Sequence, residues 1–164
     1  MNYIFKSKID NHQVIKEKLL QQINLIPQNP ILDDKQNIFH TDWNLPRAMY
    51  REYSSLFIET VTPHLEMVRE KLEAQMIEID AFWFQIYGKN GKHHWHTHPK
   101  TNYSNVYFLE CPPGFSTQFK GFSETCEEGD ILSFPAFLPH CSPTITNDFK
   151  KTVIAFNTNI IVDQ

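Results

Sequence analysis

The sequence predicts an α+β fold in which N-terminal helices support a double-stranded β-helix, that is, a jelly-roll or cupin-like barrel. Apolar residues recur at helical spacing before residue 75 and alternate with period two after it. Aromatic residues make up 13% of the chain and lie mostly after residue 80, which favours strands because flat rings pack well on a pleated sheet. Helices followed by many short strands are typical of an α+β arrangement.

The chain length sets the expected organisation. With 164 residues the chain is long enough to bury one ordinary hydrophobic core, so we expect one domain over residues 1–164. Within it, residues 1–75 are expected to be mainly helical support, and residues 76–164 are expected to form the jelly-roll core.

Charge and cysteine content exclude several kinds of partner. The formal net charge is −4 and no basic run is present, so neither nucleic acid nor a membrane surface is an expected partner. The polar N-terminus is not expected to be a signal peptide, and no apolar stretch approaches the length of a membrane span. The 3 cysteines include no Cys-x-x-Cys pair, which fits reduced thiols in the cytoplasm. A homodimer is compatible with the sequence, as is a monomer.

The first half of the chain carries two helical patterns. One begins after Asp10, a candidate N-cap that follows a short strand expected at residues 3–5, and it ends before Pro27. The other begins at Pro46, is expected to break at Pro63, and resumes as far as residue 72.

The segment between these helices, residues 27–45, is rich in Pro, Asn and Asp and is expected to be a loop. The three histidines of the first half, His12, His40 and His64, are expected at the surface or at helix caps.

The second half is predicted to consist of short strands. From residue 77 on, one face is expected to carry Ile77, Ile79, Ala81 and Trp83, and the other Glu78, Asp80, Phe82 and Phe84. Turn residues then separate further strands, which are expected at residues 106–109, 115–119, 131–134 and 152–157.

Five of the eight histidines lie between residues 93 and 140, and two of them form the pair His96-Thr97-His98. Residues two apart on a strand face the same side, so both imidazoles would enter one cavity. His140 is the last residue of a segment that is predicted to form a turn, a buried strand and a proline-rich corner. Its imidazole can therefore enter the same cavity. The spacing therefore predicts a metal site formed by His96, His98 and His140, with His93 and His94 as ordinary polar residues.

The ligand set alone leaves the metal open, because imidazole suits Zn, Cu, Fe or Ni. A closed structural zinc site normally has four ligands, often cysteines, whereas three histidines leave a coordination position free. A free position favours catalysis over a purely structural role.

Residues 83–157 resemble the Fe(II)/2-oxoglutarate-dependent dioxygenases, especially a group of small phage and bacterial oxygenases. The order and spacing of several short pieces carry the resemblance. In chain order they are Trp83-x-x-x-Tyr87, His96-Thr97-His98-Pro99, Ser104-Asn105-Val106-Tyr107-Phe108-Leu109, Glu128-Gly129-Asp130-Ile131-Leu132-Ser133-Phe134-Pro135, His140, and Ile154-Ala155-Phe156-Asn157.

The resemblance implies that His96 and His140 bind Fe(II) and that 2-oxoglutarate is the cosubstrate. The family has His-x-Asp or His-x-Glu where this chain has His-Thr-His. His98 therefore either completes a three-histidine site or leaves the third position to water or to another side chain.

The family also pairs the distal carboxylate of 2-oxoglutarate with a basic residue on the last barrel strand. Alignment on Phe156-Asn157 selects Lys151, which we favour, whereas counting on from His140 selects Lys150, with Thr152 then facing the same way. Three further hydroxyls would lie near the cosubstrate, those of Tyr87, Ser104 and Tyr107.

The activity implied by the resemblance is hydroxylation of an unidentified small-molecule or peptidyl substrate, with release of succinate and CO2. A cupin-type enzyme, either a cofactor-independent dioxygenase or an isomerase, is one alternative. Gly129, Pro135 and His140 fit the spacing of the second cupin motif, although Phe137 replaces an expected glycine and the glutamate expected after His-x-His is missing. The other alternative is a metal-free barrel that binds a ligand.

Overall fold

The computed structural model describes residues 3–163, which form two antiparallel sheets of six strands each and two helices. The major sheet has the order β1 (Phe5–Lys8), β10 (Asp130–Pro135), β7 (Tyr103–Glu110), β12 (Lys151–Ile161), β5 (Met76–Tyr87) and β4 (His40–Thr41). The minor sheet has the order β2 (Ile31–Leu32), β3 (Gln36–Ile38), β6 (Lys92–His96), β11 (His140–Ser142), β8 (Ser116–Phe119) and β9 (Phe122–Thr125). This arrangement confirms the predicted double-stranded β-helix with packing helices.

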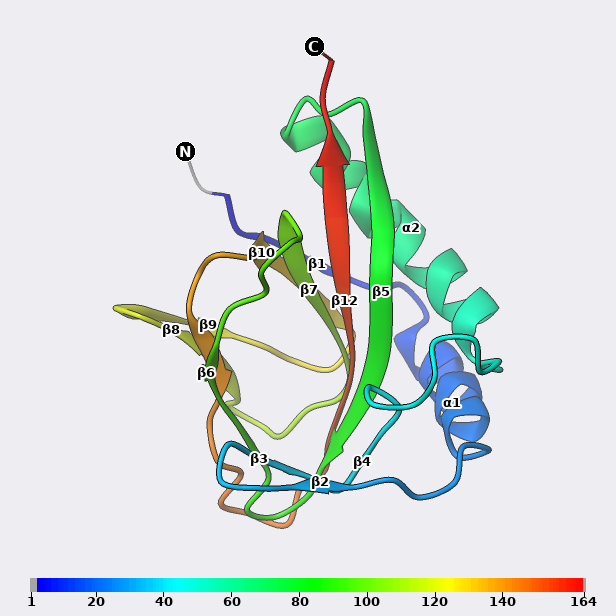
Figure 1. Cartoon of the computed structure of the whole chain (residues 1–164), viewed down its shortest axis with the longest axis vertical. Coiled ribbons are helices and arrows are strands. Elements are labelled where there is room, and N and C mark those ends of the chain that lie inside the picture. Colours follow the sequence, from blue (N-terminus) through cyan, green and yellow to red (C-terminus); the bar gives the residue numbers. More distant parts are fainter. Residues whose placement is uncertain (1–2, 164) are drawn as a thin grey trace.

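This layering gives the described residues two main hydrophobic cores, beside a smaller cluster of Phe5, Val68 and Tyr103. Helices α1 (His12–Ile23) and α2 (Ser54–Lys71) cover the outer face of the major sheet, as Figure 1 shows beside β5 and β12. Side chains such as Phe57, Phe84 and Phe156 fill the space between helices and sheet. A second core, which includes Phe108 and Phe134, lies between the two sheets. Neither helix in the described part of the chain is long and apolar enough to span a bilayer.

A β-bulge in β5 corrects the predicted alternation of faces. Asn157 of β12 is opposite Ala81, and Thr158 is opposite Ile79, so Asp80 is an extra residue on β5. Because of this extra residue, side chains before and after Asp80 no longer alternate in one continuous pattern between the two faces of the sheet. Ile77 and Ile79 therefore pack on the helix side with Phe82 and Phe84, whereas Trp83 faces the space between the sheets.

The N-terminal elements begin later than predicted. The first strand starts at Phe5, where it pairs with Ser133, so it is not centred on residues 3–5. Asn11 rather than Asp10 is the N-cap of α1, and it adopts the left-handed conformation with φ 55°. Asparagine is one of the few residues that tolerates this conformation.

Helix α2 differs from its prediction at both the start and the centre. It begins at Ser54 rather than Pro46, because the Arg51 guanidinium donates to the carbonyls of Pro46 and Met49 and holds the preceding residues in turns. The helix continues through Pro63, which is exposed, while the buried side chains of Val61 and Leu65 anchor the turns around it. The predicted break is wrong because packing on the sheet overrides the local cost of the proline.

Residues 27–45 are not an unstructured loop but contain β2, β3 and β4. Strands β2 and β3 extend the minor sheet, and β4 pairs with β5 in the major sheet. Together with β1, four strands of the first 75 residues join sheets that were expected to form from residue 76 on. Strands β2, β3 and β4 are only two or three residues long, which explains why periodicity did not reveal them.

The histidines of the first half are hydrogen-bonded, with His40 and His64 buried and His12 half-buried, which corrects the prediction of surface or capping roles. His12 donates from Nε2 to the Leu109 carbonyl and accepts at Nδ1 from the Tyr107 hydroxyl. His40 donates to the Ile26 carbonyl and is 5% exposed. His64 lies between Ser7 (2.6 Å) and Ser133 (2.7 Å), and so ties α2 to β1 and β10.

His64 should make the fold less stable in acid. Burial lowers its pKa to about 4, against about 6.5 in the unfolded chain, so the unfolded state takes up a proton first as pH falls. The free energy of unfolding should therefore decrease between pH 6.5 and 4, by about 3 kcal/mol from this group. Urea denaturation across this range should show that His64→Gln lacks this share of the loss. Equal pH dependence of the two proteins would contradict the assignment.

Candidate metal centre

Three imidazoles converge between the two sheets. One ring nitrogen each of His96, His98 and His140 lies within 4.8 Å of the other two. His96 ends β6 and His140 begins β11, and the two are direct partners across this strand pair. His98 follows the end of β6 and is held by its backbone N–H, which donates to the Ala136 carbonyl at 3.0 Å. The predicted group is therefore brought together, although His98 reaches it from a loop rather than from the strand.

Backbone carbonyls fix the tautomer of two of these rings. His96 donates from Nδ1 to the carbonyl of His94 at 2.7 Å, and His140 donates from Nδ1 to that of Leu138 at 2.9 Å. A carbonyl can only accept, so Nε2 keeps its lone pair in both neutral rings. Metal-binding histidines typically have this arrangement, in which the second ring nitrogen is hydrogen-bonded and the first is free to coordinate.

Burial keeps the three imidazoles neutral. It is the main reason why the pKa of His140 is lowered to about 3 and that of His98 to about 4, and the pKa of His96 is lowered as well. Proximity of the rings to one another lowers the pKa values of His140 and His98 further. Neutral imidazole is the form that binds a metal, so the site needs no deprotonation at neutral pH.

A bulge in β6 brings a fourth histidine, His93, to the site, although the sequence predicts an ordinary polar residue at this position. His96 is opposite His140 and His93 is opposite Ser142, so β6 advances three residues while β11 advances two. His93 and His96 consequently face the same side, and their rings stack with centroids 4.0 Å apart. Burial, and then the nearby rings and Lys151, lower the pKa of His93 to about 3. The sequence gives no signal for this bulge.

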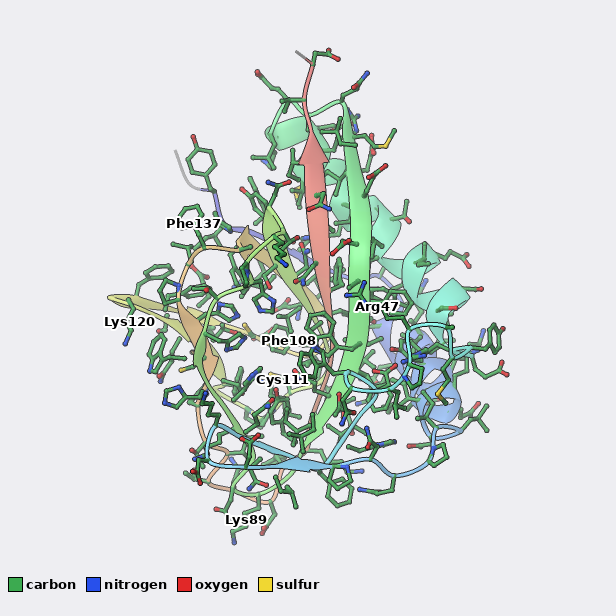
Figure 2. All side chains as sticks on the ribbon, viewed as in Figure 1. Arg47, Lys89, Phe108, Cys111, Lys120 and Phe137 are labelled. Atoms are coloured by element: carbon green, nitrogen blue, oxygen red, sulfur yellow. The ribbon has the colours of Figure 1, made fainter. Side chains whose placement is uncertain are left out.

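A small inner cavity of about 50 Å³ is lined by the three histidines and by Lys151, among other residues. Lys151 is 4% exposed, and its Nζ donates to Ser142 Oγ at 2.6 Å. The ammonium also lies over the rings of Tyr87 (4.4 Å) and Phe115 (4.3 Å), at favourable cation–π distances. Phe108, labelled in Figure 2 between the two sheets, lines the same cavity. Burial lowers the pKa of Lys151 to about 8.

The structure separates the other residues predicted near the cosubstrate into two groups. Tyr87 and Ser104 line the inner cavity. Tyr107 and Thr152 lie on the opposite face of the major sheet, where Tyr107 bonds to His12 and Thr152 donates to Glu110. Lys150 is exposed. Of the two lysines, Lys151 is therefore the one placed beside the histidines.

A larger cavity of about 670 Å³ meets the inner one at His93, His96 and His98. It reaches the surface at Trp43, which is 57% exposed, and at Arg47, labelled beside β5 in Figure 2. Arg51 in its lining is neutralised by an ion pair with Asp42 at 3.0 Å. Asn157 also lines this cavity, and its Oδ1 atom is buried with no hydrogen-bond partner among the described residues.

Among known proteins, the chain is similar to solved structures of one fold class. No family model matches the chain, and no curated protein matches it. Solved structures of similar fold include many 2-oxoglutarate–Fe(II) oxygenases, among them prolyl hydroxylases. The fold is therefore the one that these oxygenases share, as the sequence resemblance predicted.

Three of these structures illustrate the likeness. The viral collagen prolyl hydroxylase of Paramecium Bursaria Chlorella virus-1, solved with 2-oxoglutarate, is 13% identical with a TM-score of 0.67, over 98% of this chain and 97% of that one. HygX of Streptomyces hygroscopicus, with nickel and 2-oxoglutarate bound, is 11% identical with a TM-score of 0.64, over 95% and 82%. A Trichoplax adhaerens prolyl hydroxylase, in complex with a hypoxia inducible factor peptide, is 13% identical with a TM-score of 0.67, over 96% and 84%.

Proposed function

We propose that this protein is an Fe(II)- and 2-oxoglutarate-dependent oxygenase. It would hydroxylate a small-molecule or peptidyl substrate and release succinate and CO2, with residues 1–164 acting as one domain. The observation that carries the proposal is the shared inner cavity, which places a buried lysine beside three convergent neutral imidazoles. The likeness to the fold of 2-oxoglutarate–Fe(II) oxygenases also supports the proposed oxygenase function and favours it over that of a cupin-type enzyme.

The residues present fit a divalent metal ion. Three nitrogen donors lie close enough together to bind one ion, and the hydrogen bonds of His96 and His140 already orient their free Nε2 atoms. His96, His98 and His140 would hold the metal and leave positions for further ligands. Iron(II), when bound there, supplies the activation of O2 that couples decarboxylation of 2-oxoglutarate to hydroxylation.

The inner cavity fits the distal carboxylate of 2-oxoglutarate. The ammonium of Lys151 would pair with it, and Ser142, which already bonds this ammonium, would hold the lysine in place. Burial makes this charge-assisted contact stronger than it would be in water. Tyr87 and Ser104 would add hydroxyls to the same lining.

The outer cavity is the proposed place of the substrate. Its size admits either a small molecule or part of a peptide, and the peptide complex of the Trichoplax adhaerens neighbour supports a peptidyl substrate. The unpartnered Asn157 Oδ1 would accept a hydrogen bond from a substrate N–H or O–H. Trp83, which stacks on His98 with centroids 6.1 Å apart, would form an apolar wall beside the metal.

Addition of 2-oxoglutarate to the anaerobic Fe(II) protein tests this proposal. We expect a weak visible metal-to-ligand absorption band, followed by slow O2-dependent formation of succinate when air is admitted. Iron binding without a band would favour the cupin-type alternative. Absence of metal after Fe(II) reconstitution of protein purified without chelator, measured by elemental analysis, would favour the metal-free binding barrel.

A further inference from the structure

We propose that His93 is a second anchor for the dicarboxylate cosubstrate, to which its imidazole N–H donates a hydrogen bond beside Lys151. This inference rests on the proposed function and adds a residue to the same site. His93 would thus contact the cosubstrate without being a metal ligand.

The position of His93 is the first support. Its side chain lines both the inner and the outer cavity, so it lies where the two meet. Its ring stacks on that of His96 at 4.0 Å with an interplanar angle of 21°, which places it beside the metal centre. A molecule that reaches from the metal to Lys151 would occupy the inner cavity, whose lining includes this ring.

The hydrogen bonding of His93 is the second support. His96 and His140 each use one ring nitrogen on a backbone carbonyl. The ring nitrogens of His93, in contrast, have no hydrogen-bond partner within residues 3–163. An imidazole has at least one N–H in either protonation state, so a donor is left free at the cavity wall.

The size of the inner cavity is the third support. Its volume of about 50 Å³ is several times the roughly 10–15 Å³ that one water needs in such a cavity, so a carboxylate group fits, but it is far smaller than the outer cavity. If that carboxylate pairs with Lys151, the rest of the dicarboxylate would extend toward the three histidines along a wall that includes His93. The bulge in β6 is what makes this contact available, because it turns His93 inward.

Isothermal titration of the Mn(II)-loaded protein with 2-oxoglutarate tests the role of His93. His93→Phe keeps a ring that can stack on His96 but removes the N–H, and we expect it to raise the Kd for 2-oxoglutarate about tenfold or more. His93→Gln keeps a donor and should recover most of the affinity. The exposed neighbour His94 provides the matched control, and His94→Ala should bind as the unchanged protein does.

The Mn(II) content of each variant, with circular dichroism as a check of folding, separates the outcomes. An unchanged Kd in His93→Phe would overturn the inference. So would loss of Mn(II) from a folded His93→Phe protein, because His93 would then act on the metal site. If the unchanged protein binds Mn(II) but not 2-oxoglutarate, the proposed function itself fails.

Discussion

His140→Ala should lose stoichiometric iron and most O2-dependent succinate formation. The substitution removes one of three nitrogen donors, and the two that remain are on β6 and the loop after it. Changes to residues that only support a metal ligand already cost roughly 10–100-fold in affinity or activity, so loss of a ligand should cost more. Elemental analysis and a succinate assay measure the two effects.

Two comparisons make the His140 result decisive. His94→Ala removes an exposed imidazole close to the site and should leave metal content unchanged. His98→Ala tests whether His98 is the third metal ligand. We expect this substitution to lower the metal content as His140→Ala does. If His140→Ala is folded and retains a full equivalent of iron, the three-histidine site is wrong.

Among the residues of the inner cavity other than the three metal-binding candidates, Lys151→Met should weaken 2-oxoglutarate binding most strongly. Removal of one partner of a buried, hydrogen-bonded charge pair costs about 2–5 kcal/mol, which corresponds to roughly thirty- to several-thousandfold in Kd. Methionine fills a similar volume between Tyr87 and Phe115, so the barrel should still fold. Lys150→Met changes an exposed lysine and should bind 2-oxoglutarate normally. Unaltered binding by Lys151→Met would exclude the proposed pairing.

The same lysine should give 2-oxoglutarate binding a pH dependence. Burial lowers the pKa of Lys151 to about 8, so the empty protein loses the ammonium charge as pH rises through that value. The affinity should therefore be constant below about pH 8 and decrease above it. In Lys151→Met this decrease should be absent, which titrations at several pH values would reveal.

The fold could be predicted because long periodic segments dominate it. Strands β5, β7 and β12 bury whole rows of apolar side chains, and α1 and α2 carry clear apolar faces. The bulge at Asp80 could not be predicted, because it is set by pairing with β12 rather than by β5 itself. The continuous helix through Pro63 likewise depends on packing against the sheet.

The site residues that belong to a recognisable sequence motif could be predicted. His-x-His and the later histidine at 140 gave the three metal-binding candidates, and alignment on the last strand favoured Lys151. It was harder to predict which face of a sheet each side chain occupies, because one extra residue in a strand moves the following side chains to the opposite face. His93 was missed for this reason, and Tyr107 and Thr152 were expected near the cosubstrate although they lie on the helix side of the sheet.

The inner cavity has no aspartate or glutamate among the described residues that line it. A divalent cation on three neutral imidazoles would keep its full charge there, and Lys151 would add another. Each positive charge is costly when it is alone in a buried space and is offset when a dianion joins it. By thermodynamic reciprocity, 2-oxoglutarate should then tighten metal binding by the same factor by which the metal tightens 2-oxoglutarate binding. Neither affinity measured alone would describe the assembled complex.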